Sequence, residues 1–240
     1  DLTKPDLAIS TAAKAPVKEA FQIQLQFTEE VYGLTAADMT VTGATLSDLK
    51  ASNKSNYTAT ITPPANGQGT ASISLAANKA TDLAGNGNTA SNKLEIAYDL
   101  KRPKVTLSSD APQIVKAPFT VKFTFDEAVT GFAATDISVS NGSAGSLTAE
   151  SANVYTATIT PAVDGEVVVS LGANKATDEA GNGNEASVEF KRLYDVAPPT
   201  VTLATTASEL TNEAIPVTVT FSETVTGLSA SSFSATNGKV

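Results

Sequence analysis

The stretch FTVKFTF at Phe119–Phe125 alternates apolar and polar side chains, and FQIQLQF at Phe21–Phe27 does the same. Because successive side chains of a strand point to opposite faces, this period of two predicts strands with one buried and one solvated face. The same alternation marks Tyr155–Ile159 and Val167–Leu171. Short strands of this kind, separated by Gly, Asn and Pro turns, predict an all-β protein built from antiparallel sandwiches.

The chain repeats this pattern at a long interval. Phe27 of FTEEVYG matches Phe125 of FDEAVTG, an offset of 125 − 27 = 98, and the loop TDLAGNGN at Thr81–Asn88 returns as TDEAGNGN at Thr177–Asn184, an offset of 177 − 81 = 96. With about seven strands to a unit, the pattern predicts tandem Ig-like antiparallel β-sandwiches. We divide the chain into repeat 1 (1–98), repeat 2 (99–194) and the N-terminal part of repeat 3 (195–240). Because the sequence starts inside the pattern, we expect it to be a segment of a longer chain.

Composition removes several classes of function. The 240 residues include no cysteine and no histidine, which excludes disulfides, thiolate metal sites and histidine-based catalysis. Only paired carboxylates remain for chemistry, so we expect no enzyme. The 16 basic against 25 acidic residues give a net charge of −9, which is unfavourable for binding nucleic acid. No apolar run approaches the roughly 20 residues that a membrane helix needs, so we expect no membrane insertion in this segment.

Acidic residues are expected to meet at one end of repeat 2. In an Ig-like sandwich the start of the first strand, the turn after the second strand and the loop before the last strand share one end. These positions hold Asp99, Glu127 and the loop with Asp178 and Asn182. Packed carboxylates repel each other unless a cation offsets their charge, and Ca²⁺ accepts six to eight oxygens from carboxylates, Asn side chains and carbonyls. The sequence therefore predicts a calcium site at the junction of repeats 1 and 2.

The same set recurs along the chain. Repeat 1 carries Asp1, Glu29, Asp82 and Asn86, and repeat 3 begins the set with Asp195 and Glu223. An alternative interpretation needs no ion, because Asp, Asn and Gly are ordinary turn residues. Thr-Asp followed by Ala-Gly would then form a capped single helical turn that ends at Gly181. Both interpretations stay open at the level of sequence.

The units share several related phrases, among them VTFSETVTG at Val219–Gly227 of repeat 3, and YTATITP at Tyr155–Pro161 and the AGNGN loop, which repeats 1 and 2 both contain. In combination they resemble the bacterial Ig-like repeats of large secreted surface proteins, including giant adhesins. The resemblance implies an extracellular stalk of many modules in series, and some such relatives bind calcium between modules. We therefore expect a structural extender at the cell surface whose partners are the other repeats of the same chain. The alternatives are a surface-layer or filament subunit that contacts neighbouring copies, and a carbohydrate- or protein-binding module.

Overall fold

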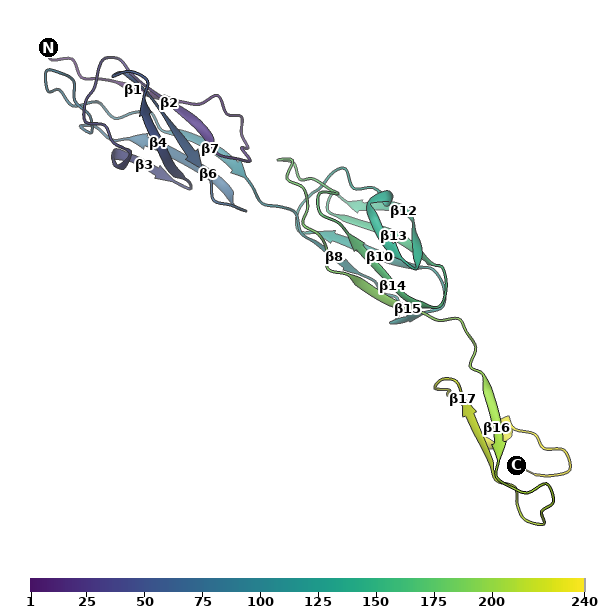
Figure 1. Cartoon of the computed structure of the whole chain (residues 1–240). Coiled ribbons are helices and arrows are strands. Elements are labelled where there is room, and N and C mark those ends of the chain that lie inside the picture. The colour runs from purple at the N-terminus through teal and green to yellow at the C-terminus, as the bar shows by residue number, and fades with distance from the viewer. Residues whose placement is uncertain (240) are drawn as a thin grey trace.

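The computed structural model describes residues 1–239 as two complete β-sandwiches followed by a smaller β unit. The three units follow one another from the N-terminus to the C-terminus (Figure 1). The helices of this part of the chain are short 3₁₀ turns, namely η1 (Ala36–Asp38), η2 (Ala134–Asp136) and η3 (Ala230–Ser232). None of the described helices has the length and apolar character needed to cross a membrane.

Repeat 1 contains the first seven strands. They are β1 (Leu7–Ser10), β2 (Phe21–Phe27), β3 (Met39–Thr42), β4 (Thr45–Ala51), β5 (Asn56–Thr62), β6 (Gln68–Leu75) and β7 (Leu94–Asp99). Repeat 2 contains the next eight. They are β8 (Val105–Ser108), β9 (Ile114–Val115), β10 (Phe119–Phe125), β11 (Ile137–Ser140), β12 (Gly142–Ser151), β13 (Val154–Pro161), β14 (Gly165–Leu171) and β15 (Phe190–Tyr194).

The strand order is that of an Ig-like sandwich. In repeat 1 a sheet of order β1-β2-β5-β4 accompanies a sheet of order β3-β6-β7, and repeat 2 has the orders β12-β13-β10-β8 and β11-β14-β15-β9. With strands lettered along the chain, these are the ABED and CFG sheets of the constant-type Ig fold. The added strand β9 runs parallel to β15, and a parallel bridge from Val17 to Tyr98 takes its place in repeat 1. The predicted fold class is confirmed.

The alternating residues build the two cores. Every odd residue of β2 and β10 is buried while the intervening Gln, Thr and Lys side chains are exposed. Val121 and Phe123 are fully buried, as is Ile23 in repeat 1. Burial of a large apolar side chain contributes about 1.5–3 kcal/mol, so this face of each sheet holds the sandwich together.

The described part of repeat 3 contains two strands, β16 (Val201–Thr205) and β17 (Val217–Phe221). They pair in the register of β8 and β10, with Val201 opposite Phe221 as Val105 is opposite Phe125. No second sheet covers this pair within residues 1–239, so Leu203 stays 63% exposed.

Candidate functional site at the repeat junction

Two clusters of three carboxylates form where the sequence places the acidic sets. In each, one oxygen from every residue lies within 4.8 Å of the others. We call Asp99, Glu127 and Asp178 the junction cluster, and Asp1, Glu29 and Asp82 the N-terminal cluster. The glutamates follow β2 and β10, and Asp82 and Asp178 lie in the loops before β7 and β15. The sandwich thus brings together residues that are up to about eighty positions apart, as the fold topology requires.

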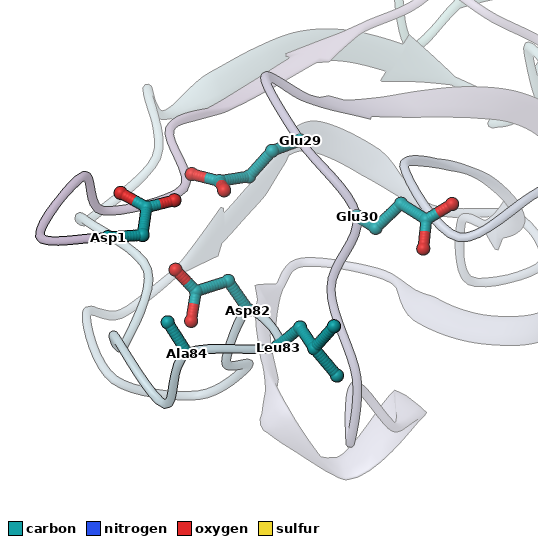
Figure 2. A pocket seen from close by; sticks show the side chains of 6 residues that line it. All are labelled: Asp1, Glu29, Glu30, Asp82, Leu83 and Ala84. Atoms are coloured by element: carbon teal, nitrogen blue, oxygen red, sulfur yellow. The ribbon is translucent and has the colours of Figure 1, made fainter.

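Figure 2 shows the N-terminal cluster from close by. The carboxylates of Asp1, Glu29 and Asp82 turn toward one another, whereas the side chain of Glu30 points away from them. A shallow hollow of about 410 Å³ lies over the cluster. The acidic side chains therefore face a space that solvent ions can reach.

Asp99 belongs to both repeats at once. It is the last residue of β7, where its amide donates to the Val17 carbonyl at 3.0 Å and its carboxylate accepts from Gln68 Nε2 at 3.0 Å. Its own carbonyl oxygen accepts a hydrogen bond from Asn182 Nδ2 of repeat 2 at 3.0 Å. The junction cluster is consequently assembled from two sandwiches.

Three of the four aspartates in these clusters are buried, whereas Asp1 is exposed. Asp82, Asp99 and Asp178 are 6%, 8% and 5% exposed, and no other carboxylate among residues 1–239 is buried to this degree. A buried carboxylate is costly unless hydrogen bonds or a cation compensate it. The burial is thus concentrated where negative charges are already close together.

Glu127 has the least favourable surroundings of the junction cluster. Burial raises its pKa, the charge of Lys101 opposes that rise, and the nearby carboxylates of Asp126 and Asp178 add to it. Its Oε1 atom is buried without a hydrogen-bond donor. Lys101 Nζ lies 3.4 Å from this oxygen as an ion pair whose geometry makes no hydrogen bond. The negative charge at this point is only partly compensated.

Asn86 and Asn182, which the sequence predicts as oxygen ligands, donate hydrogen bonds through their nitrogen atoms. Asn182 donates from Nδ2 to Asp178 Oδ2 at 2.9 Å as well as to Asp99, and its amide donates to Asp178 Oδ1 at 2.8 Å. Asn86 makes the same contacts with Asp82, and its side-chain hydrogen bond is the main cause of a lowered pKa at Asp82. The two asparagines thus orient the carboxylates through their backbone amides and Nδ2 atoms.

The loop Thr177–Asn184 and its counterpart Thr81–Asn88, which we call the glycine loops, contain ordinary turn structure. The Gly181 amide donates to the Asp178 carbonyl at 3.1 Å, and Gly181 has a φ of +83°. This is a single β-turn and not the helical turn that the alternative interpretation predicts. A Cβ atom at Gly183 would overlap the side chain of Asn174. Gly181 is therefore required by its backbone angle and Gly183 by the closeness of Asn174, whether or not an ion binds.

The second asparagine of each GNGN phrase, which the sequence analysis did not identify, holds the loop together. Asn184 is fully buried, and its Oδ1 accepts from the amides of Lys175 and Ala176 at 2.7 and 2.8 Å. Its Nδ2 donates to the carbonyls of Gly172 and Glu185 at 2.9 and 2.6 Å. Asn88 has the same arrangement in repeat 1. The recurrence of this asparagine was the available signal.

Arg102 was also missed. Its Nε donates to the Gly183 carbonyl at 2.8 Å, and its Nη2 donates to Asn184 O at 2.7 Å and to Asn174 Oδ1 at 2.8 Å. It thereby attaches the linker after β7 to the loop of repeat 2. Repeat 1 has Lys4 at the matching position, so comparing the repeats does not mark Arg102 as important.

Asp195 and Glu223 lie at the start of repeat 3. Asp195 Oδ1 accepts from the Ala197 amide at 3.2 Å, as Asp99 Oδ1 accepts from the Lys101 amide at 3.0 Å. Glu223 is exposed. The two acidic clusters described above are the ones that residues 1–239 form, and neither includes these two residues.

Comparison with known proteins places this architecture in a family. Among solved structures, the chain is similar to the Escherichia coli adhesin FdeC (16% identity, 92% of this chain and 74% of that chain, TM-score 0.34). It is also similar to the Yersinia pseudotuberculosis adhesin InvE (16%, 80% and 59%, TM-score 0.27) and to the N-terminal part of the bacterial S-layer protein SbsC (12%, 81% and 45%, TM-score 0.29). A search of curated protein sequences gives no significant match. A family model described as "Bacterial Ig-like domain" matches residues 1–98 and 99–193, so the chain belongs to the bacterial Ig-like domain family.

Proposed function

We propose that this chain is a structural segment of a bacterial cell-surface protein, an extender in which calcium fixes the angle between successive repeats. One observation carries the proposal: the junction cluster takes Asp99 from the last strand of repeat 1 and Glu127 and Asp178 from repeat 2. An ion held by all three carboxylates connects the two sandwiches directly.

The spacing of the cluster suits one ion. Calcium–oxygen distances are about 2.3–2.6 Å, so two ligands of one ion lie up to about 5 Å apart. The three carboxylate oxygens of the junction cluster fall within this limit, at 4.8 Å or less from one another. Backbone carbonyls and water would supply the rest of the six to eight ligands that calcium takes.

The chemistry of the cluster favours a hard cation. The chain offers no His or Cys ligand, and carboxylate oxygen suits Ca²⁺ or Mg²⁺ rather than zinc or copper. Ca²⁺ tolerates irregular coordination, whereas Mg²⁺ demands near-ideal octahedral geometry. Carboxylates on separate loops match the less demanding ion. Binding would also compensate the buried charge of Asp178 and Glu127.

The proposed role is mechanical. Extracellular calcium sites often bind with affinities of about 10⁻⁴–10⁻³ M. At a calcium concentration equal to the dissociation constant, such a site stabilises the fold by only about 0.4 kcal/mol. The ion would therefore set the shape of the rod rather than its folding stability. Location at the cell surface is part of this proposal, and membership in the bacterial Ig-like domain family supports it.

Calorimetric titration of the 240-residue chain with calcium tests the proposal. We expect saturable binding that Asp178→Ala abolishes at the junction cluster and Asp82→Ala abolishes at the N-terminal cluster. Asp110→Ala is the matched control, because this exposed aspartate lies outside both clusters. Absence of saturable binding up to several millimolar would reject the calcium joint and leave lateral assembly of copies as the function to test.

A further inference from the structure

Lys101 places a positive charge inside the junction. It lies in the linker two residues after Asp99, and its Nζ is 2.9 Å from Asp126 Oδ2 and 3.4 Å from Glu127 Oε1. The close contact with Asp126 and the charges of both carboxylates raise the pKa of Lys101, while desolvation opposes the rise. One ammonium group thus contacts a member of the junction cluster and the carboxylate beside it.

This ion pair is specific to one junction. The position of Lys101 is Thr3 in repeat 1 and Ala197 in repeat 3. The position of Asp126 is Thr28 in repeat 1 and Ser222 in repeat 3. Across the three repeats, the lysine and its aspartate partner therefore occur together in repeat 2 and are both absent from repeats 1 and 3.

The turn itself does not require the aspartate. Asp126 Oδ1 accepts from the Lys104 amide at 2.8 Å. At the equivalent positions, the hydroxyl oxygens of Thr28 and Ser222 accept hydrogen bonds from the amides of Asp6 and Thr200 at 3.0 and 2.9 Å. A hydroxyl thus fulfils the backbone role, and what aspartate adds is a second oxygen, which contacts Lys101.

We propose that Lys101 holds the linker against repeat 2 without a metal ion, through its ion pairs with Asp126 and Glu127. We call this set of contacts the latch. The latch ties the chain just beyond β7 to the loop that carries Glu127, so it orders this junction when calcium is scarce. Its bearing on calcium affinity rests on the proposed function, because Lys101 and the ion would both face Glu127. The ordering of the metal-free junction does not depend on calcium binding.

The latch is tested by distance measurements across the junction in EDTA. Because the chain has no cysteine, spin labels can be attached at Lys50→Cys and Thr148→Cys, two exposed strand positions at equivalent places in repeats 1 and 2. We compare Lys101→Thr, Asp126→Thr and the double variant, which restores the pair of threonines found in repeat 1. The control is Lys122→Thr, which removes an exposed ion pair with Glu150 elsewhere in repeat 2.

We expect each of the three junction variants to broaden the distance distribution in EDTA, with the double variant no broader than the single ones. Lys122→Thr should leave the distribution unchanged. Unchanged distributions in the junction variants, with both repeats folded by circular dichroism, would overturn the latch.

Calcium titration of the same variants separates the latch from the calcium joint. Lys101→Thr leaves Asp126 unpaired and should tighten calcium binding by about fivefold, as expected for one nearby charge. Asp126→Thr should weaken binding by about as much, and the double variant should return close to the unchanged protein. Equal affinities in all four proteins would refute the effect on calcium. If none of them binds calcium, the proposed function fails while the EDTA distances still decide the latch.

Discussion

Repeats 1 and 2 keep the same hydrogen bonds in their glycine loops while their cores differ. The amides of Asn86 and Asn182 reach Asp82 and Asp178 at 2.8 Å in both copies. By contrast, Leu25 and Leu34 of repeat 1 are replaced by Phe123 and Phe132 in repeat 2. Apolar volume can change where neighbouring side chains adjust, but a buried polar network tolerates no missing partner. The comparison indicates that the sequence of the glycine loop is more constrained than the sequence of the core in each repeat.

The largest effect is expected for Asn184→Ala. The substitution leaves the amides of Lys175 and Ala176 and two carbonyls without their buried partner. Each lost partner costs about 1–3 kcal/mol, and water entering the space left by the side chain recovers part of it. We expect repeat 2 to lose about 3–5 kcal/mol, measured by hydrogen exchange with peptide resolution.

Asn182→Ala is the control for that loss, because Asn182 is less buried and its side chain donates only to the Asp178 carboxylate and the Asp99 carbonyl. It should cost distinctly less than Asn184→Ala. Equal losses from the two substitutions would contradict the assignment of Asn184 as the centre of the loop.

Phe132→Leu makes the core of repeat 2 more like that of repeat 1. The Phe132 ring lies edge-to-face against Phe123 and Tyr155 at centroid distances of 5.3 Å, and against Phe125 at 5.7 Å. Loss of these pairs and of apolar volume should lower the free energy of unfolding of repeat 2 by about 1–3 kcal/mol. The measurement is denaturant unfolding, with Leu34→Phe as the reciprocal change. If Leu34→Phe stabilised repeat 1 as much as Phe132→Leu weakened repeat 2, the Phe123 ring, which is Leu25 in repeat 1, would have no role in holding Phe132.

Arg102→Lys tests the difference between the two linkers, since repeat 1 has Lys4 there. Lysine cannot reproduce the planar guanidinium that donates to Gly183, Asn184 and Asn174 at the same time. We expect a loss of about 1–2 kcal/mol in repeat 2, with faster amide exchange confined to the loop around Asn182. An exchange pattern identical to that of the unchanged protein would show that a point charge is sufficient.

The smallest effect concerns pH and the turns before β3 and β11. The Thr35 hydroxyl donates to Asp38 Oδ2 at 2.6 Å and is the main cause of a lowered pKa at Asp38, whereas Ala133 offers Asp136 no hydroxyl. A depressed carboxyl pKa stabilises the fold above the unfolded value of 3.8 and loses this effect as pH falls through the folded value.

Thr35→Ala should therefore lower the melting temperature of repeat 1 slightly at pH 7, and the difference from the unchanged protein should fade as the pH falls below 3.8 and through the lowered pKa of Asp38. Ala133→Thr should have the opposite sign in repeat 2. A difference that grows toward acid pH would show that the sign is wrong.

The fold was predictable because alternation in Phe119–Phe125 reports directly which residues face the core. The approach of Asp99, Glu127 and Asp178 was predictable from the Ig-like topology, which places their three segments at one end. Whether Asn182 presents oxygen or nitrogen was not predictable, since it depends on the orientation of one amide. Lys101 and Arg102 escaped detection because their contacts cross from the linker to loops far along the chain and do not recur in repeat 1.

The most direct test of the calcium joint is the spin-label distance between Lys50→Cys and Thr148→Cys, measured with and without saturating calcium. If calcium fixes the junction, the distance distribution is narrower with calcium than in EDTA, where only Lys101 orders the junction. Asp178→Ala then removes this narrowing. A distribution that is the same in EDTA and in several millimolar calcium would contradict the account, even if the ion bound elsewhere on the chain.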